Sequence, residues 1–123
     1  MLEQFENQQY INLETFRKNG EGVKTPVWFT QDRDVLYAWT QADSWKAKRI
    51  RNNGKVKVVP SKADGEPVGE WVDAHATADD SDAALKFTKS LMRKKYGFAF
   101  VAFDLMGKLR KSKHTSLKIE FGE

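Results

Sequence analysis

Three strand-like segments separated by two turns lie near the start of the chain, and this pattern limits the fold more than any other feature. Residues 10–16, 23–30 and 35–40 are rich in β-branched and aromatic side chains, which favour strands. The sequences RKNGEG and QDRD lie between them and are typical of turns. Two successive hairpins predict an antiparallel meander in this part of the chain.

The second strand-like segment contains Pro26. Proline has no N–H group to donate to a strand ladder, so a strand that contains it lies at an edge there or is bulged. We therefore expect the strand over residues 23–30 to lack one neighbour, or to carry a bulge, at this point.

A short helix and two more strands are expected next. Ser44 is a suitable N-cap for a helix over residues 45–53, and Gly54 is a suitable residue just past its end. Alternating apolar residues indicate further strands on either side of a Gly/Pro loop at residues 63–69. These strands are expected over residues 55–59 and 70–78.

The hydrophobic period changes in the second half of the chain. Residues 79–81 (DDS) offer an N-cap and negative charge, which both favour the start of a helix. An apolar stripe at helical spacing follows, and it predicts a helix that ends near Gly97. The stripe consists of Ala84, Phe87, Leu91 and Met92. Residues 98–109 (FAFVAFDLMGKL) fit both a helix and a strand; we favour a helix, and expect a closing strand over residues 115–121.

The order of these elements predicts the fold class. Mostly antiparallel strands with one short inserted helix indicate a mainly β fold, a small antiparallel barrel of about six strands with short helices packed outside. A length of 123 residues suits a single domain over residues 1–123. With four Trp, eight Phe and three Tyr the chain can build an apolar core, to which a partner subunit would add stability.

Composition excludes several classes of function. A net charge of +4 is modest for a dedicated DNA-binding domain. The absence of cysteine excludes disulfides, thiolate metal sites and cysteine nucleophiles. The first ten residues are polar, so no signal peptide is expected. No apolar run approaches the roughly 20 residues of a membrane span, and we expect a cytoplasmic protein without a membrane partner.

Two histidines, His75 and His114, are too few for a metal site without further ligands at suitable spacing, so no metal is expected. Ser44 has no histidine partner in the sequence pattern, which argues against a nucleophilic triad. The basic segment KLRKSKH at residues 108–114 is expected to be a solvated turn between two elements. No side chain stands out as an acid or a base, so the catalytic residues stay unknown.

The stretch YAWTQADSWKAKRIRNNG, residues 37–54, combines a strand end, a turn and the start of a basic helix. A helix N-terminus presents free N–H groups and attracts phosphate. Ser44 adds a hydroxyl there, Lys46 adds a positive charge, and the side chain of Thr40 can point toward the same helix N-terminus. Lys48 or Arg49 is close enough in sequence to contribute.

The same cations also fit a plainer interpretation. Basic surface helices are common, and the four cations of this helix would then form a solvated face. These cations are Lys46, Lys48, Arg49 and Arg51. Trp45, between them, would be either a stacking wall or a core residue. The charge pattern alone leaves both interpretations open.

Residues 23–59, which contain the TPVWF and TQADSWK sequences, resemble the flavin-binding core of the pyridoxamine 5′-phosphate oxidase-like split-barrel superfamily. In that superfamily an element similar to T-N-x-x-S-R-K holds the phosphate of FMN. The sequence NNG at residues 52–54 stands where the family has N-N-P. The TPVWF and WT…S…K pieces look closest to the branch of deazaflavin (coenzyme F-420)-dependent enzymes. The resemblance covers about residues 10–78.

This resemblance implies a flavin site at the interface of a homodimer. Lys24 would reach the ribityl or phosphate region, while Ser44 and Lys46 would hold the phosphate. Trp39 and Thr40 would flank the ribityl chain. The edge of the ring would be lined by Thr25, Pro26, Val27 and Trp28.

The chain also departs from the family pattern. Trp45 stands where the family has an arginine, so Lys48, Arg49 or Lys24 would have to replace that cation. The sequence KHTSLKIEFGE lacks the tryptophan that the oxidase uses to bind pyridoxal phosphate, so a role in vitamin B6 synthesis is not expected.

We therefore expect an FMN-dependent oxidoreductase that acts on a small-molecule substrate of unknown identity. One alternative keeps the fold and binds deazaflavin (coenzyme F-420) as a cosubstrate. Another is a non-enzymatic flavin- or heme-binding protein. The least favoured alternative is a basic barrel that binds single-stranded nucleic acid.

Overall fold

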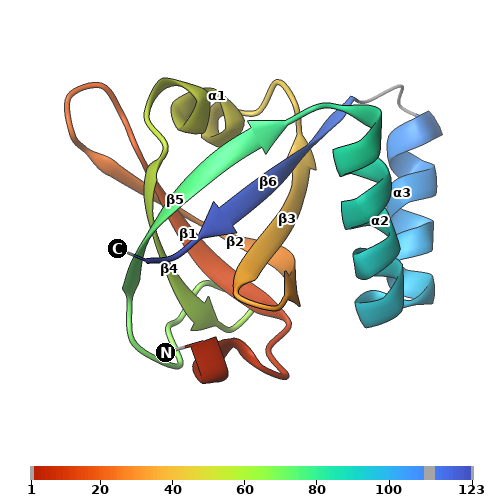
Figure 1. The fold of residues 1–123 in the computed structure, drawn as a ribbon, viewed down its shortest axis with the longest axis horizontal. Helices are drawn as coiled ribbons and strands as arrows, with labels where there is room; N and C mark the ends of the chain where they lie inside the picture. The colour runs from red at the N-terminus through yellow and green to blue at the C-terminus, as the bar shows by residue number, and fades with distance from the viewer. Residues whose placement is uncertain (1, 110–112, 123) are drawn as a thin grey trace.

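Six antiparallel strands form a closed barrel in the order β1-β2-β3-β6-β5-β4, with the helices outside it (Figure 1). The computed structural model describes residues 2–109 and 113–122, so residues 110–112 of the basic segment lie outside the described residues. The strands are β1 (Tyr10–Phe16), β2 (Gly22–Asp32), β3 (Val35–Gln41), β4 (Lys55–Ser61), β5 (Val72–Asp79) and β6 (His114–Glu120). The helices are the 3-10 helix η1 (Leu2–Phe5) and the α-helices α1 (Trp45–Asn52), α2 (Asp82–Tyr96) and α3 (Phe98–Leu109). The predicted mainly β barrel is confirmed.

The core lies inside the barrel, because alternate residues of each strand face inward. In β3, Leu36 and Ala38 are fully buried while Tyr37 between them is only half-buried. Figure 1 shows α1 at one end of the barrel and η1 at the other. Each closes its end with an apolar side chain: Ile50 from α1 and Phe5 from η1 are almost completely buried.

The barrel is split between β2 and β3. Residues 22–28 of β2 pair with β1, whereas only residues 29–32 of β2 pair with β3. If the pairing of β2 with β3 continued toward the start of β2, Trp28 would face Trp39 and Pro26 would face Gln41. The strands diverge there instead, so Pro26 has a strand neighbour on one side only. The prediction of an edge at the proline is confirmed.

A tyrosine hydroxyl holds β2 at the point of divergence. The N–H of Phe29 donates to Tyr96 Oη at 2.9 Å, and this hydroxyl lies 2.6 Å from the carbonyl oxygens of both Phe29 and Gln9. Burial raises the pKa of Tyr96, so the hydroxyl stays protonated and donates a hydrogen bond to one of these carbonyls. Because successive strand residues direct their main-chain groups to opposite edges, those of Pro26 and Trp28 face the open side.

The two long helices lie together on one side of the barrel (Figure 1). Ser81 is the N-cap of α2 and accepts a hydrogen bond from the N–H of Ala84, as predicted from the DDS sequence. Gly97, with a positive φ of 59°, turns the chain into α3. Residues 98–109 form a helix, the alternative that we favoured. In the described part of the chain, no helix has both the length and the apolar character to cross a membrane.

Candidate functional site

A cleft of about 460 Å³ opens where β2 and β3 diverge, and we call it the fork cleft. Its walls come from the two strands, the start of α1, the α2–α3 pair and the first residues of β1 and β6. It is lined by Tyr10, Pro26, Val27, Trp28, Trp39, Thr40, Gln41, Lys46, Met92, Phe100, Phe103 and His114. A cleft of this size, mainly apolar with a few polar groups, is typical of a small-molecule site.

Stacked rings fix the two indoles at the base of the fork. Trp28 stacks on Tyr96, with ring centroids 4.4 Å apart and planes 6° from parallel. Trp39 stacks on His114 at 5.1 Å, and the ring of Phe100 meets it edge-on at 6.1 Å. Each indole therefore has a partner that holds its orientation. Fixed aromatic walls of this kind suit a flat, largely apolar ring.

One polar atom of the cleft wall has no partner within the described residues. The indole Nε1 of Trp39 is buried and makes no hydrogen bond. An unsatisfied buried donor costs about 1–3 kcal/mol. An acceptor atom brought within reach of Nε1 would remove this cost.

A positive charge lies at the α1 end of the cleft. Lys46 is half-buried, and burial lowers its pKa, with a smaller contribution from the charge of Arg49. Across residues 2–109 and 113–122, no carboxylate forms an ion pair with Lys46. The neighbouring Ser44 is the N-cap of α1, and its hydroxyl accepts from the N–H of Ala47 at 3.3 Å. An anion at this corner would meet a desolvated ammonium group and the N-terminal end of a helix.

The structure brings together part of the predicted site. The predicted residues that line the fork cleft are Pro26, Val27, Trp28, Trp39, Thr40 and Lys46. Ser44 lies two residues before Lys46 and caps the same helix, whereas Lys48 and Arg49 line a neighbouring groove. Lys24 is exposed, with its ammonium 5.2 Å from the ring centroid of Trp71, and Thr25 does not line the cleft.

Other lining residues were missed because they come from segments far away in sequence. His114 lies opposite Gln41 in the β3–β6 ladder, and this pairing places it beside Trp39. Phe100 and Phe103 reach the cleft because α3 folds back alongside α2. No local sequence signal marks these residues, since their position depends on which strands and helices become neighbours.

His114 is held mainly in its neutral form. Burial lowers its pKa; the charge of Asp104 opposes this shift and that of Lys89 adds to it. The Lys89 ammonium of α2 and the Asp104 carboxylate of α3 form an ion pair of 3.0 Å. A neutral imidazole can donate through one nitrogen and accept through the other. His114 is therefore a polar group available at an otherwise aromatic wall.

A larger hollow of about 750 Å³ lies between η1 and α2. It is more open than the fork cleft and contains none of the predicted site residues. Among the described residues, no cluster of three or more His, Cys, Asp or Glu side chains could hold a metal ion. The fork cleft is therefore the better candidate site.

No protein-family model matches the sequence, and no curated protein matches it. Solved structures, in contrast, match almost the whole chain. HutZ, the heme storage protein from Vibrio cholerae, has a TM-score of 0.75 at 15% identity, over 98% of this chain and 87% of that protein. The conserved protein Rv2991 from Mycobacterium tuberculosis has a TM-score of 0.72 at 17% identity, over 98% of this chain and 78% of that protein.

An F420 reductase also matches, with a TM-score of 0.63 at 17% identity, over 99% of this chain and 93% of that protein. The chain has the split-barrel fold of the pyridoxamine 5′-phosphate oxidase-like superfamily. Identities this low show the fold alone. The opening of this split barrel between β2 and β3 is the feature that forms the fork cleft.

Proposed function

We propose that the fork cleft binds the isoalloxazine ring of FMN, with the phosphate at Lys46, and that the protein is a flavin-dependent oxidoreductase. The observation that carries this proposal is the half-buried Lys46, without an acidic partner among the described residues, at the end of an aromatic cleft. Nearly all of the chain aligns with the F420 reductase structure, and this supports a cofactor site in this fold.

A bound flavin would supply the hydride-transfer chemistry. The protein would position it: the open edge of β2 would offer main-chain groups to the polar rim of the ring, and Lys46 would neutralise the phosphate. Phe100 and Phe103 would exclude water from one side of the ring. His114 would donate or accept a hydrogen bond near the reacting region.

The first alternative is a deazaflavin cosubstrate in the same cleft. Its longer anionic tail would extend past Lys46 toward Lys48 and Arg49, which line the next groove. Arg51 is not suited to this role, because its guanidinium donates to the carbonyl of Ala42 at 2.7 Å and lies 3.5 Å from Asp80.

The second alternative is a non-enzymatic heme carrier. It is favoured by the neutral imidazole of His114 in the cleft, since a neutral imidazole is the form that binds a metal. The similarity in fold to the heme storage protein HutZ supports the same alternative. Heme binding would produce a Soret absorption band that is lost in His114→Ala, whereas flavin binding would produce neither effect.

We also propose that the protein is a homodimer. The argument rests on α3, which exposes five large apolar side chains: Phe98, Val101, Phe103, Leu105 and Met106. Phe103 belongs to the wall of the fork cleft as well, so a second copy packed on α3 would also cover the mouth of the site. A patch of this kind on a small protein marks an interaction surface.

The proposed site is tested by titrating the protein with FMN, and in parallel with deazaflavin, while following tryptophan fluorescence. Trp28 and Trp39 line the cleft and should report binding directly. Lys46→Ala should weaken FMN binding about 10- to 100-fold, because a charge-assisted hydrogen bond to phosphate is lost. Lys57→Ala, which removes an exposed lysine of β4, is the matched control and should bind as the wild type does.

If the protein binds deazaflavin but not FMN, the proposed site stands and the proposed cofactor is wrong. Failure of both to bind would overturn the proposed function, as would equal FMN affinity of the wild type and Lys46→Ala. In that case the cations of α1 would form a solvated helix face.

A further inference from the structure

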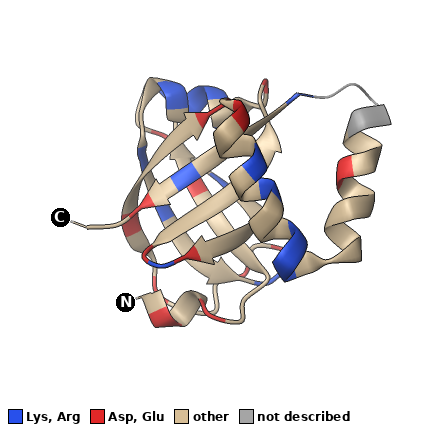
Figure 2. Ribbon diagram, turned by 45° about the vertical axis from the view of Figure 1, so that its right-hand side comes forward, with Lys and Arg blue, Asp and Glu red and all other residues tan. Residues whose placement is uncertain are grey.

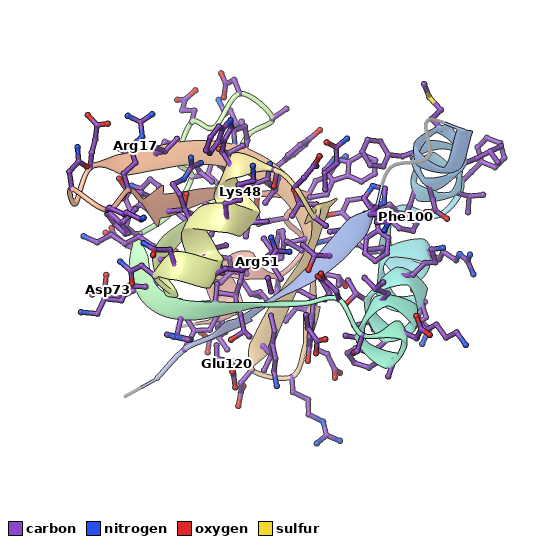
Figure 3. The ribbon with its side chains drawn as sticks, turned by 90° about the horizontal axis from the view of Figure 1, so that it is seen from above. Arg17, Lys48, Arg51, Asp73, Phe100 and Glu120 are labelled. Atoms are coloured by element: carbon purple, nitrogen blue, oxygen red, sulfur yellow. The ribbon has the colours of Figure 1, made fainter. Side chains whose placement is uncertain are left out.

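A third hollow, of about 600 Å³, lies between α1 and the β1–β2 hairpin, and we call it the hairpin groove. It is lined by Phe16, Arg17, Lys18, Val23, Trp45, Lys48, Arg49 and Asn52. Four of these side chains are cationic and none is acidic. Figure 2 shows the basic residues gathered on α1, and Figure 3 shows Arg17 of the hairpin and Lys48 of α1 on the same side of the molecule.

The cations of this groove are only partly neutralised within the described residues. Arg17 forms an ion pair with Glu21, an exposed residue of the hairpin. Arg49 donates through Nε to the Thr15 hydroxyl at 2.7 Å, and its pKa is lowered by burial and then by the charge of Arg17. The two guanidinium groups therefore repel each other, and an anion between them would relieve this repulsion.

Trp45 supplies a flat aromatic surface at the same groove. Its side chain is 72% exposed, although indole is among the most costly side chains to leave in water. The ammonium of Lys48 lies 4.6 Å from the ring centroid on one face. An exposed indole next to several cations is the arrangement that binds a base and its phosphate together, through stacking and charge.

The hairpin groove and the fork cleft are both lined by residues of β2 and of α1. Val23 lines the groove and Pro26 lines the cleft, and both belong to the part of β2 that has no neighbour on its open side. At 3.4 Å per residue, these two positions are about 10 Å apart along the strand. The charge of Arg49 also reaches Lys46 and lowers its pKa. Lys46 of the cleft thus lies on the same helix as Trp45, Lys48 and Arg49 of the groove, within three residues of each.

We propose that the hairpin groove binds the adenylate half of a dinucleotide flavin, so that the protein prefers FAD to FMN. This inference rests on the proposed function, because it requires the flavin ring in the fork cleft. The first phosphate would lie at Lys46, the second at Arg49 and Arg17, and the adenine would stack on Trp45. The anionic tail of a deazaflavin would contact the same cations but would leave the Trp45 indole without a stacking partner.

The test measures the dissociation constants of FAD and FMN by titration calorimetry for the wild type, Trp45→Ala and Trp45→Phe. The wild type should bind FAD about 5- to 100-fold more tightly than FMN, the range expected for stacking one base on an aromatic side chain. Trp45→Ala should remove this preference and leave the affinity for FMN unchanged. Trp45→Phe, which keeps an aromatic ring, should retain most of it.

The FMN measurement separates the two proposals. Equal affinities of the wild type for FAD and FMN would overturn the adenylate site, and the flavin site would stand. An equal loss of affinity for FAD and FMN in Trp45→Ala would also overturn the adenylate site, because FMN has no adenylate half. The flavin site would stand in that case too. Failure of the wild type to bind either flavin would overturn both proposals.

Discussion

Trp28 and Trp39 would oppose each other on the outer face of the sheet if β2 and β3 stayed paired. Instead each indole stacks on a ring from another element, Trp28 on Tyr96 of α2 and Trp39 on His114 of β6. Pro26, two residues before Trp28, could not have donated to β3 in any case. Single residues thus account for the position of the fork, and the fork in turn creates the cleft.

The titration of His114 predicts a pH dependence of stability. Because burial lowers its pKa below the ordinary value of 6.5, the unfolded chain binds a proton more readily than the folded chain does. The free energy of unfolding should therefore be fully retained above about pH 6.5 and should fall as the pH drops toward the lowered pKa. Urea unfolding at pH 7.5 and pH 5.5 measures this fall.

His114→Phe is the reference variant for this experiment, since it keeps a ring against Trp39 and removes the titrating nitrogen. Asp104 and Lys89, whose charges act on His114, are present in both proteins, so their own titration largely cancels in the comparison. The wild type should lose more stability than His114→Phe between the two pH values. An equal loss in both would show that His114 does not cause the effect.

At the level of elements, the joint between α2 and β2 depends on the hydroxyl of Tyr96. This group accepts from Phe29 and lies within hydrogen-bonding distance of the carbonyls of Phe29 and Gln9, at the position where β1 no longer pairs with β2. Lys95 Nζ also donates to the Phe29 carbonyl at 2.8 Å. The end of α2 therefore replaces a strand as the partner of β2 at this point.

Tyr96→Phe should lower the free energy of unfolding by about 1–3 kcal/mol, because the N–H of Phe29 loses its acceptor in a half-buried place. The ring stacked on Trp28 is retained, so the effect belongs to the hydroxyl alone. Tyr37→Phe is the matched control: within the described residues the Tyr37 hydroxyl makes no hydrogen bond, and the change should stay within about 0.5 kcal/mol. Denaturant unfolding of both variants measures the difference, and equal stabilities would contradict this role of Tyr96.

The elements themselves could largely be predicted because their signals are local. The Ser44 and Ser81 caps and the alternation of apolar residues in the strands are visible in short stretches of sequence. Boundaries were less accurate: β2 extends to Asp32 and β5 begins at Val72, since ladder pairing and not composition sets where a strand ends. The 3-10 helix η1 was not expected, because its main anchor is the burial of Phe5 in the barrel.

The candidate site could be predicted only where it follows the continuous stretch from β2 to α1. Pro26, Trp28 and Lys46 belong to that stretch and line the cleft. His114 and Phe100 come from the other half of the chain, and only the closure of the barrel brings them there. Lys48 and Arg49 were expected at the phosphate, but the helical period turns them toward the hairpin groove, where the structure places them.

At the scale of the whole molecule, α3 is the element least explained by a single chain. It contacts the rest of the protein through a narrow stripe that contains the buried Phe100 and Asp104, four residues apart. Most of its remaining surface is apolar and exposed, including Phe98 at 83% and Leu105 at 57%. A water-soluble helix normally carries polar residues on the face opposite its core. The proposed homodimer gives this face a partner.

The double substitution Phe98→Glu and Leu105→Glu should convert the dimer to a monomer, because a dimer would then bury two unpaired carboxylates on each α3. Neither side chain packs in the barrel core, so the free energy of unfolding within one chain should change little. Sedimentation equilibrium measures the mass, and Val68→Glu, which places the same charge on an exposed apolar residue of the loop before β5, is the control and should remain dimeric.

A monomeric wild type at micromolar concentrations, or a dimeric double variant, would contradict dimerisation through α3. If the variant is monomeric and also binds FMN more weakly, the partner subunit covers the fork cleft, since Phe103 of the same helix forms part of its wall.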